Sequence, residues 1–303
     1  MSEPLAYLHS RLMPASQASL SLHDSGFVMG ATVTDLCRTV QHRLYRWDDH
    51  LARFRHSCGA AQLVPPLADG ELTRIANDLV ARNAGLLAVE HDLALVLFIT
   101  AGEIGYYSGQ ATGVGEAPPT FGMYTFPLPF ARYRRLFREG ARLAVPSTRQ
   151  VPAACVEPHI KHRSRLHWWL ADREVYHRHP GATAVLLDAE GHLTETAAAN
   201  LLLVKSRTVL SPPRSSILPG VSLQVVEELC HEQGNPFAER PLTMLDARTA
   251  DEILLTSTPF CLCGVSSFDG LAVPWPRPMF QLLLAAWSAT IGVDIQGQIE
   301  KVG

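Results

Sequence analysis

A lysine in a cationic stretch is the first residue of this sequence that could do covalent chemistry. Lys161 lies in EPHIKHRSRLHWWL, at the expected entrance to a helix, among His159, His162, Arg163 and Arg165. Neighbouring cations lower the pKa of a lysine, which favours the neutral amine that attacks an aldehyde. A lysine in a basic stretch can also be a solvated surface residue or part of a patch for an acidic ligand, so Lys161 needs partner motifs.

A carboxylate further along the chain could serve a heterocyclic ring. Glu195 ends a predicted hairpin strand in LLDAEGHLTETAAANLLLV and is followed by small residues that leave room for a ligand. A carboxylate against a ring nitrogen keeps that nitrogen protonated and strengthens the ring as an electron sink. Without a partner motif, Glu195 would be an exposed acid at the end of a strand.

A helix start could bind an anion. In SPPRSSILPGVSLQVVEELC, a Pro-Gly turn precedes a helix whose apolar face contains Val221, Val225 and Leu229. Backbone N–H groups at such a helix start, together with the positive end of the helix dipole, suit a phosphate.

The elements that must position these residues follow from the hydrophobic periods and the Gly and Pro positions. Mixed strands and helices without regular βαβ alternation predict an α+β fold. Two prolines and several arginines separate the halves, so we expect a small N-terminal domain at 1–125, a linker at 126–135 and a larger C-terminal domain at 136–303. The main predicted helices cover residues 48–63 (capped by Asp48 or Asp49), 70–85, 166–179, 220–234 and 278–292, with a buried strand at 93–100.

Composition excludes several classes of partner. A net charge of −3 over 303 residues, without a long block of like charge, predicts no nucleic-acid partner. No apolar run reaches the roughly 18 residues of a membrane helix, and six scattered cysteines indicate reduced thiols, so we expect a cytoplasmic protein without a membrane partner. His159, His162 and His167 lack an acidic or cysteine partner at ligand spacing, and no metal site is predicted.

Read together, the motifs resemble class IV pyridoxal-phosphate enzymes over nearly the whole chain. These enzymes include branched-chain aminotransferases, D-amino acid aminotransferases and aminodeoxychorismate lyases. The stretch DSGFVMG matches a D-x-G-F-x-x-G turn, HLAR matches H-L-x-R, and TETAAAN matches T-E-x-x-x-x-N. LPGVS matches the phosphate loop L-P-G-[IV]-[ST], and Ser257-Thr258 matches a later phosphate contact.

The resemblance implies the cofactor, the fold and the roles of residues. It implies a two-domain fold-type IV enzyme, similar to D-amino acid aminotransferase, with pyridoxal 5′-phosphate at the domain interface and a homodimeric assembly. Lys161 becomes the Schiff-base lysine and catalytic residue, Glu195 the partner of the pyridine nitrogen, and Arg53 a phosphate ligand through its guanidinium fork. The full implied cofactor set is Arg53, Lys161, Glu195, Asn200, Leu218, Gly220, Val221, Ser222, Ser257 and Thr258.

Departures from the family pattern concern the substrate. Asp35 stands where the family often has Glu, and Ala101 stands where several members have a carboxylate-binding arginine. Arg132 or Arg163 could replace that arginine. We therefore take Asp35 and Arg163 as candidate substrate contacts.

The resemblance favours one reaction and leaves two alternatives open. We expect ping-pong transfer of an amino group between an amino acid, for example a branched-chain one, and a 2-oxo acid. KHRSRL and ETAAANL are similar to aminodeoxychorismate lyases, so a lyase that releases pyruvate is the second hypothesis. A protein that binds the cofactor without turnover is the third.

Overall fold

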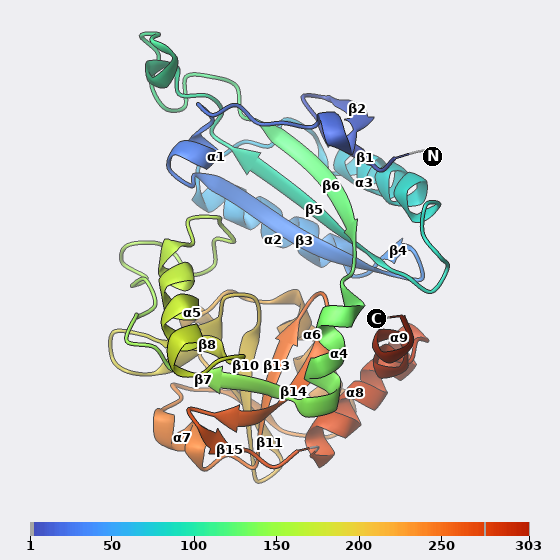
Figure 1. The fold of residues 1–303 in the computed structure, drawn as a ribbon, viewed down its shortest axis with the longest axis vertical. Helices are drawn as coiled ribbons and strands as arrows, with labels where there is room; N and C mark the ends of the chain where they lie inside the picture. The colour runs from blue at the N-terminus through green and yellow to red at the C-terminus, as the bar shows by residue number, and fades with distance from the viewer. Residues whose placement is uncertain (1–2, 276, 303) are drawn as a thin grey trace. The chain divides into compact units, whose positions relative to one another are not determined.

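The computed structural model of the protein describes residues 3–275 and 277–302. The chain forms two compact units, Met1–Leu128 with Ile160–Arg165, and Pro129–His159 with Leu166–Gly303 (Figure 1). Both units mix helices with largely antiparallel strands, which confirms the α+β prediction. The segment at 126–135, expected as a linker, holds the end of one strand and the start of a helix.

The N-terminal unit is built on an antiparallel sheet with strand order β2-β1-β6-β5-β3-β4. Its strands are β1 (Leu5–Leu8), β2 (Arg11–Pro14), β3 (Thr32–Val40), β4 (Arg43–Leu44), β5 (Leu93–Thr100) and β6 (Phe121–Pro127). Its helices are α1 (Ser25–Val28), α2 (Trp47–Ala60) and α3 (Asp69–Ala84), with short 3-10 turns at Ala15–Gln17 and Gly105–Ser108.

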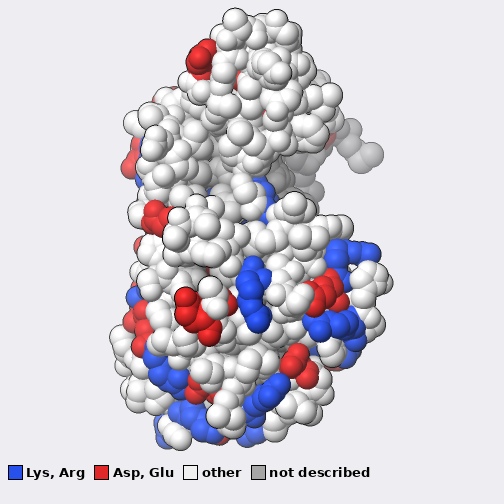
Figure 2. All heavy atoms as spheres, turned by 90° about the vertical axis from the view of Figure 1, so that its left-hand side faces the viewer, with Lys and Arg blue, Asp and Glu red and all other residues white. Residues whose placement is uncertain are grey.

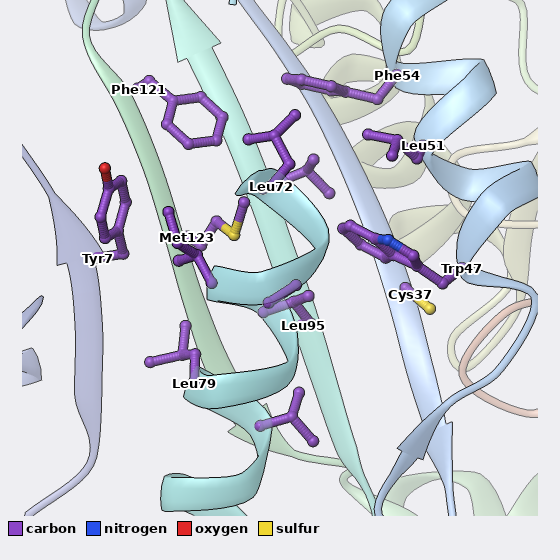
Figure 3. Packing of buried hydrophobic residues seen from close by; sticks show 14 of the residues in the cluster. Tyr7, Cys37, Trp47, Leu51, Phe54, Leu72, Leu79, Leu95, Phe121 and Met123 are labelled. Carbon is purple, nitrogen blue, oxygen red and sulfur yellow. The ribbon is translucent and has the colours of Figure 1, made fainter. Parts of the chain in front are cut away.

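Helices α2 and α3 cover one face of this sheet (Figure 3). Each strand alternates its side chains, so every second residue of β5 faces the helices. The buried contacts between helices and sheet include Leu51 and Phe54 of α2, Leu72 and Leu79 of α3, Cys37 of β3, Leu95 of β5, and Phe121 and Met123 of β6. The packing in this core determines which side chains of β3 point toward α2.

Helix α2 begins one residue earlier than expected. Arg46, at φ 57°, is the N-cap, and Asp48 and Asp49 lie in the first turn rather than at the cap. The two acids still favour this position because negative charge near a helix N-terminus interacts well with the helix dipole. The predicted cap was therefore wrong, although the helix itself is present.

The C-terminal unit has a sheet with the order β12-β11-β10-β13-β14-β7-β8-β9, and β15 pairs with β14. Its strands are β7 (Ala141–Ala144), β8 (Thr183–Leu187), β9 (Leu193–Thr196), β10 (Asn200–Lys205), β11 (Thr208–Ser211), β12 (Phe237–Glu239), β13 (Glu252–Ser257), β14 (Cys261–Phe268) and β15 (Leu271–Ala272). Its helices are α4 (Phe130–Glu139), α5 (Leu166–Arg178), α6 (Val221–Glu232), α7 (Met244–Arg248), α8 (Pro278–Ile291) and α9 (Ile295–Val302), and Arg214–Ser216 forms a 3-10 turn.

An additional pairing between β9 and β10 closes part of this sheet on itself. The paired residues are Glu195 and Asn200, so the closure is made by two of the candidate site residues. Helix α5 packs on β7 and β8 through Trp168, Ala171 and Val175. The predicted helix after Lys161 is thus confirmed as α5.

Acidic and basic side chains are interspersed on the face of the molecule in Figure 2. Selectivity for a charged ligand therefore has to come from individual side chains rather than from a broad field on this face. Within residues 3–275 and 277–302, no single helix is long and apolar enough to cross a membrane; α8 and α9 pass such a test only as a pair, bent by 86°.

Candidate active site

The candidate residues fall into two groups, one in each unit. In the N-terminal unit, the segment that carries Lys161 is bonded to strand β3. Thr34 N donates to Lys161 O at 2.9 Å, and Arg163 N donates to Thr32 O at 2.9 Å. Lys161 N donates to Ser57 Oγ on α2 at 3.1 Å. The backbone of Lys161 is therefore held on both sides, which restricts where its amine can reach.

The D-x-G-F-x-x-G turn supports the same segment. Ser164 Oγ donates to Gly30 O at 2.8 Å, and Gly30 has φ +69°, a conformation that favours glycine. Asp24 caps α1 by accepting from Gly26 N at 2.7 Å and also accepts from Thr100 Oγ1 at 2.9 Å. The turn thus links the Lys161 segment to the sheet.

Asp35 forms a buried cluster with two residues of α2. Val33 and Cys37 face the helices, and the strand period of two places Asp35 on that same side. Asp35 Oδ1 lies 2.8 Å from His50 Nδ1 and accepts from Arg53 Nη2 at 2.8 Å, while Oδ2 accepts from Arg53 Nε at 2.8 Å. The side chains of Asp35, His50 and Arg53 are 0%, 2% and 8% exposed.

This geometry favours a structural role for Asp35 over the expected contact with substrate. Its carboxylate is fully buried, and it also accepts from the backbone N of Leu36 at 2.7 Å. An oxygen pair that already accepts from a backbone, an imidazole and a guanidinium has little capacity for a substrate. Asp35 is placed to hold Arg53 and His50 rather than to contact the substrate.

Burial and charge shift the ionisation of this cluster. Burial alone would raise the pKa of Asp35, but the Arg53 guanidinium and the His50 ring together hold that pKa well below its usual range. Burial lowers the pKa of His50, although the bond to ionised Asp35 opposes this shift. His50 is therefore a neutral ring near neutral pH, and its Nδ1 carries the hydrogen that it donates to Asp35.

Acidification should destabilise the protein first through His50. In the unfolded chain a histidine gains its proton as the pH falls through about 6.5, whereas folded His50 has a lower pKa and resists protonation. The free energy of unfolding should then fall by up to about 1.4 kcal/mol per pH unit from this group. Asp35 acts with the same sign, but only as the pH falls below about 3.9.

Urea unfolding between about pH 7.5 and pH 5 measures this slope. His50→Gln should give a smaller slope than the wild-type protein in this window because it removes the buried titrating ring. An unchanged slope would mean that His50 does not resist protonation in the folded state.

In the C-terminal unit, Glu195 is fixed by its neighbours. Asn200 Nδ2 donates to Glu195 Oε2 at 3.0 Å and to Leu218 O at 2.9 Å, and Leu218 N donates to Glu195 Oε1 at 3.1 Å. Glu195 is 9% exposed. One side-chain amide therefore joins the carboxylate to the loop before α6, which brings together motifs that are distant in sequence.

The start of α6 is arranged for an anion. Gly220 is the N-cap, and it supplies no side-chain hydrogen bond to the helix start, where backbone N–H groups lack intrahelical partners. A Cβ at Gly220 would lie 2.1 Å from Asn200 Oδ1, so only glycine lets the loop approach this closely. Ser222, in the first turn, is buried, as is Ser257 at the end of β13.

Ser257 connects β13 to the turn after Glu195. Its Oγ donates to Ala198 O at 2.6 Å, and half-buried Thr258 follows it. Within the C-terminal unit, a fixed carboxylate and a helix start with backbone N–H donors suit a protonated ring nitrogen and a phosphate respectively. This set of donors and acceptors fits pyridoxal phosphate.

Sequence reasoning missed Ser57 and the role of His50. Both lie with Arg53 on one side of α2, because residues 50, 53 and 57 follow the helical spacing of three and four. This spacing within HLARFRHS is the signal that could have found them.

Comparison with known proteins identifies the family. The sequence pattern of the family described as amino-transferase class IV matches residues 32–268. A Methanocaldococcus jannaschii protein assigned as a branched-chain-amino-acid aminotransferase is 27% identical over 269 residues, which cover 88% of each chain. The D-alanine aminotransferase of Bacillus licheniformis is 24% identical, with 88% of each chain covered. This chain belongs to the class IV aminotransferases.

A solved structure shows the same fold. The T.th. branched-chain amino acid aminotransferase, complexed with N-(5′-phosphopyridoxyl)-L-glutamate, superposes with a TM-score of 0.83 at 21% identity and covers 96% of this chain and 95% of that one. The predictions of a class IV, pyridoxal-phosphate-dependent aminotransferase with an α+β fold are confirmed by the family match. The relatives are aminotransferases, which favours transamination over the lyase hypothesis.

Proposed function

We propose that Lys161 binds the cofactor of this aminotransferase, and that it moves the protons required to transfer an amino group between an amino acid and a 2-oxo acid. The observation that carries this proposal is the fixed backbone of Lys161, bonded to Thr34 and Ser57. Bound pyridoxal phosphate supplies an electron sink that stabilises negative charge on the substrate α-carbon. With the cofactor bound, Lys161 Nζ would remove the α-proton of the substrate as a general base and would later give that proton back as a general acid.

Glu195 keeps a proton on the pyridine nitrogen in this proposal. Its two oxygens accept from Asn200 and Leu218, so its position is set before the cofactor arrives. A carboxylate held in place loses less entropy on binding than a mobile one.

Within the C-terminal unit, the cofactor phosphate is assigned to the start of α6. Arg53, in the N-terminal unit, stays a proposed phosphate ligand because its guanidinium fork suits a phosphate. The backbone of the LPGVS loop and the hydroxyls that follow complete the proposed phosphate set, which comprises Leu218, Gly220, Val221, Ser222, Ser257 and Thr258.

Gly220→Ala should weaken cofactor binding. The added methyl group displaces the Asn200 amide, which then loses its bonds to Glu195 and Leu218. Overpacking of about 1–3 kcal/mol corresponds to a loss of roughly 5- to 150-fold in cofactor affinity. Fluorescence titration of the cofactor-free protein measures this. Gly59→Ala is the matched control because a Cβ at Gly59 of α2 meets open space, so this variant should bind the cofactor like the wild-type protein. Equal cofactor affinity of the wild-type protein and both variants would contradict the proposed site.

Steady-state kinetics separate this function from its rivals. A transaminase gives parallel double-reciprocal lines for amino acid and 2-oxo acid, because the first product leaves before the second substrate binds. Release of pyruvate from aminodeoxychorismate without any 2-oxo acid would instead establish the lyase. Cofactor binding without either reaction would establish a protein without turnover. Branched-chain amino acids and D-alanine, the substrates in the names of the relatives, are the donors to test first.

We also propose a cytoplasmic homodimer. Five of the six cysteines are buried, and all six are free, as is common in a reducing compartment. Leu22 and Phe27 of the N-terminal unit are 73% and 70% exposed, an apolar surface that a second copy could cover. Light scattering should then report twice the mass of the chain.

A further inference from the structure

The residues around Lys161 alternate between two faces of the sheet. His162 is the direct antiparallel partner of Val33, which faces α2 and α3, and Ile160 packs against the same core. Cross-strand partners share a face, and successive residues of an extended segment point to opposite faces. Lys161 and Arg163 therefore lie on the face away from the helices.

Thr34 occupies that second face as well, because it follows Val33 on β3. Arg163 Nη2 reaches Thr34 Oγ1 at 3.5 Å, a long contact, while the Thr34 hydroxyl donates to Leu97 O at 3.0 Å. The hydroxyl hydrogen thus points away, and an oxygen lone pair is left toward the guanidinium. The contact agrees with the alternation and places Arg163 beside β3.

The Arg163 guanidinium lacks a compensating acid. Arg163 is exposed to solvent. Within residues 3–275 and 277–302, no carboxylate lies within ion-pair distance of the Arg163 guanidinium. Its backbone is nevertheless held, since Arg163 N donates to Thr32 O and the next residue, Ser164, is bonded to Gly30. A fixed backbone with an available planar fork is suited to a carboxylate brought by a ligand.

We propose that Arg163 binds the α-carboxylate of the substrate whose amino group reacts beside Lys161. Residues two apart in an extended segment are separated by about 6.6 Å, so both side chains reach a molecule of amino-acid size on one face. Arg163 then discriminates an α-amino acid from an amine that lacks the carboxylate. This inference rests on the proposed role of Lys161, and the experiment below separates the two.

The experiment compares Arg163→Gln with Arg43→Gln, a control at an exposed arginine of β4 in the same unit. The probes are the amino acid that the wild-type holoenzyme converts fastest, the amine that lacks its carboxylate and the acid that lacks its amino group. For leucine these are 3-methylbutylamine and 4-methylvaleric acid. Circular dichroism and thermal midpoints check that both variants fold like the wild-type protein.

Arg163→Gln should reduce kcat/KM for the amino acid by roughly 10- to 100-fold, the size of a lost hydrogen bond between charged groups. The value for the amine should change less than threefold. Titration of the holoenzyme, followed by cofactor absorbance, should show the same loss in affinity for the carboxylic acid, without turnover. Arg43→Gln should match the wild type throughout.

Three results would overturn the inference in distinguishable ways. Unchanged affinity of Arg163→Gln for the carboxylic acid removes the carboxylate contact. An equal loss for amino acid and amine shows that Arg163 acts on the cofactor or the fold instead. A wild-type holoenzyme that converts no amino acid contradicts the proposed function itself, and the inference with it.

Discussion

We expect Lys161→Ala to abolish the covalent attachment of the cofactor and to reduce amino-group transfer by more than about 10³-fold, because general acid–base catalysis alone contributes about 10²–10⁴-fold. The variant has no amine at the position that the bonds to Thr34 and Ser57 fix. Absorbance spectra of the purified variant with added cofactor, and initial rates with the best amino donor, measure the two effects separately.

Lys205 provides the control for this prediction. It lies at the exposed end of β10, in the C-terminal unit, where its Nζ donates to Thr249 O. Lys205→Ala should keep the cofactor band and turnover. Full activity of Lys161→Ala would refute the assignment, whereas loss of both activities in the Lys205 variant would point to general instability.

Asp35→Asn should reduce the free energy of unfolding by about 3–5 kcal/mol, the cost of removing one partner of a buried ion pair. The neutral amide of the variant removes the counter-charge of the Arg53 guanidinium, whose side chain is only 8% exposed. It also places an N–H group against the N–H donors of Arg53 and His50. Urea denaturation at neutral pH measures the change.

A matched control is the exposed ion pair between Arg55 of α2 and Asp69 at the start of α3, whose side chains are 29% and 63% exposed. Asp69→Asn should cost no more than about 1 kcal/mol, as is typical of surface pairs. If both variants lost an equally small part of the free energy of unfolding, the buried Asp35 cluster would contribute no more to stability than an exposed ion pair.

The sequence predicts much of the candidate site because each motif combines residue type with local backbone. Gly220 ahead of a helix, and Glu195 at the end of a strand, are features that a strand or helix pattern can predict without any tertiary contact. The structure adds the contact between them, through Asn200. That contact depends on the closure of β9 onto β10, which no local pattern reports.

The role of Asp35 is beyond such reasoning. A polar residue on a strand can face solvent, substrate or core, and only the packing of α2 against β3 decides among them. The attachment of residues 160–165 to the N-terminal unit is non-local in the same way, since its partners, Thr34 and Ser57, are more than a hundred residues earlier in the chain. A single boundary at 126–135 therefore does not reproduce the compact units, because residues 160–165 belong to the N-terminal unit.

The cofactor bond itself gives the most direct test of the account. The sequence contains three lysines, Lys161, Lys205 and Lys301, so borohydride reduction of the holoenzyme followed by peptide mass spectrometry has few possible outcomes. We predict one reduced pyridoxyl group, on the peptide that contains Lys161. A label on Lys205 or Lys301, or no label on a protein that transfers amino groups, would contradict the central claim.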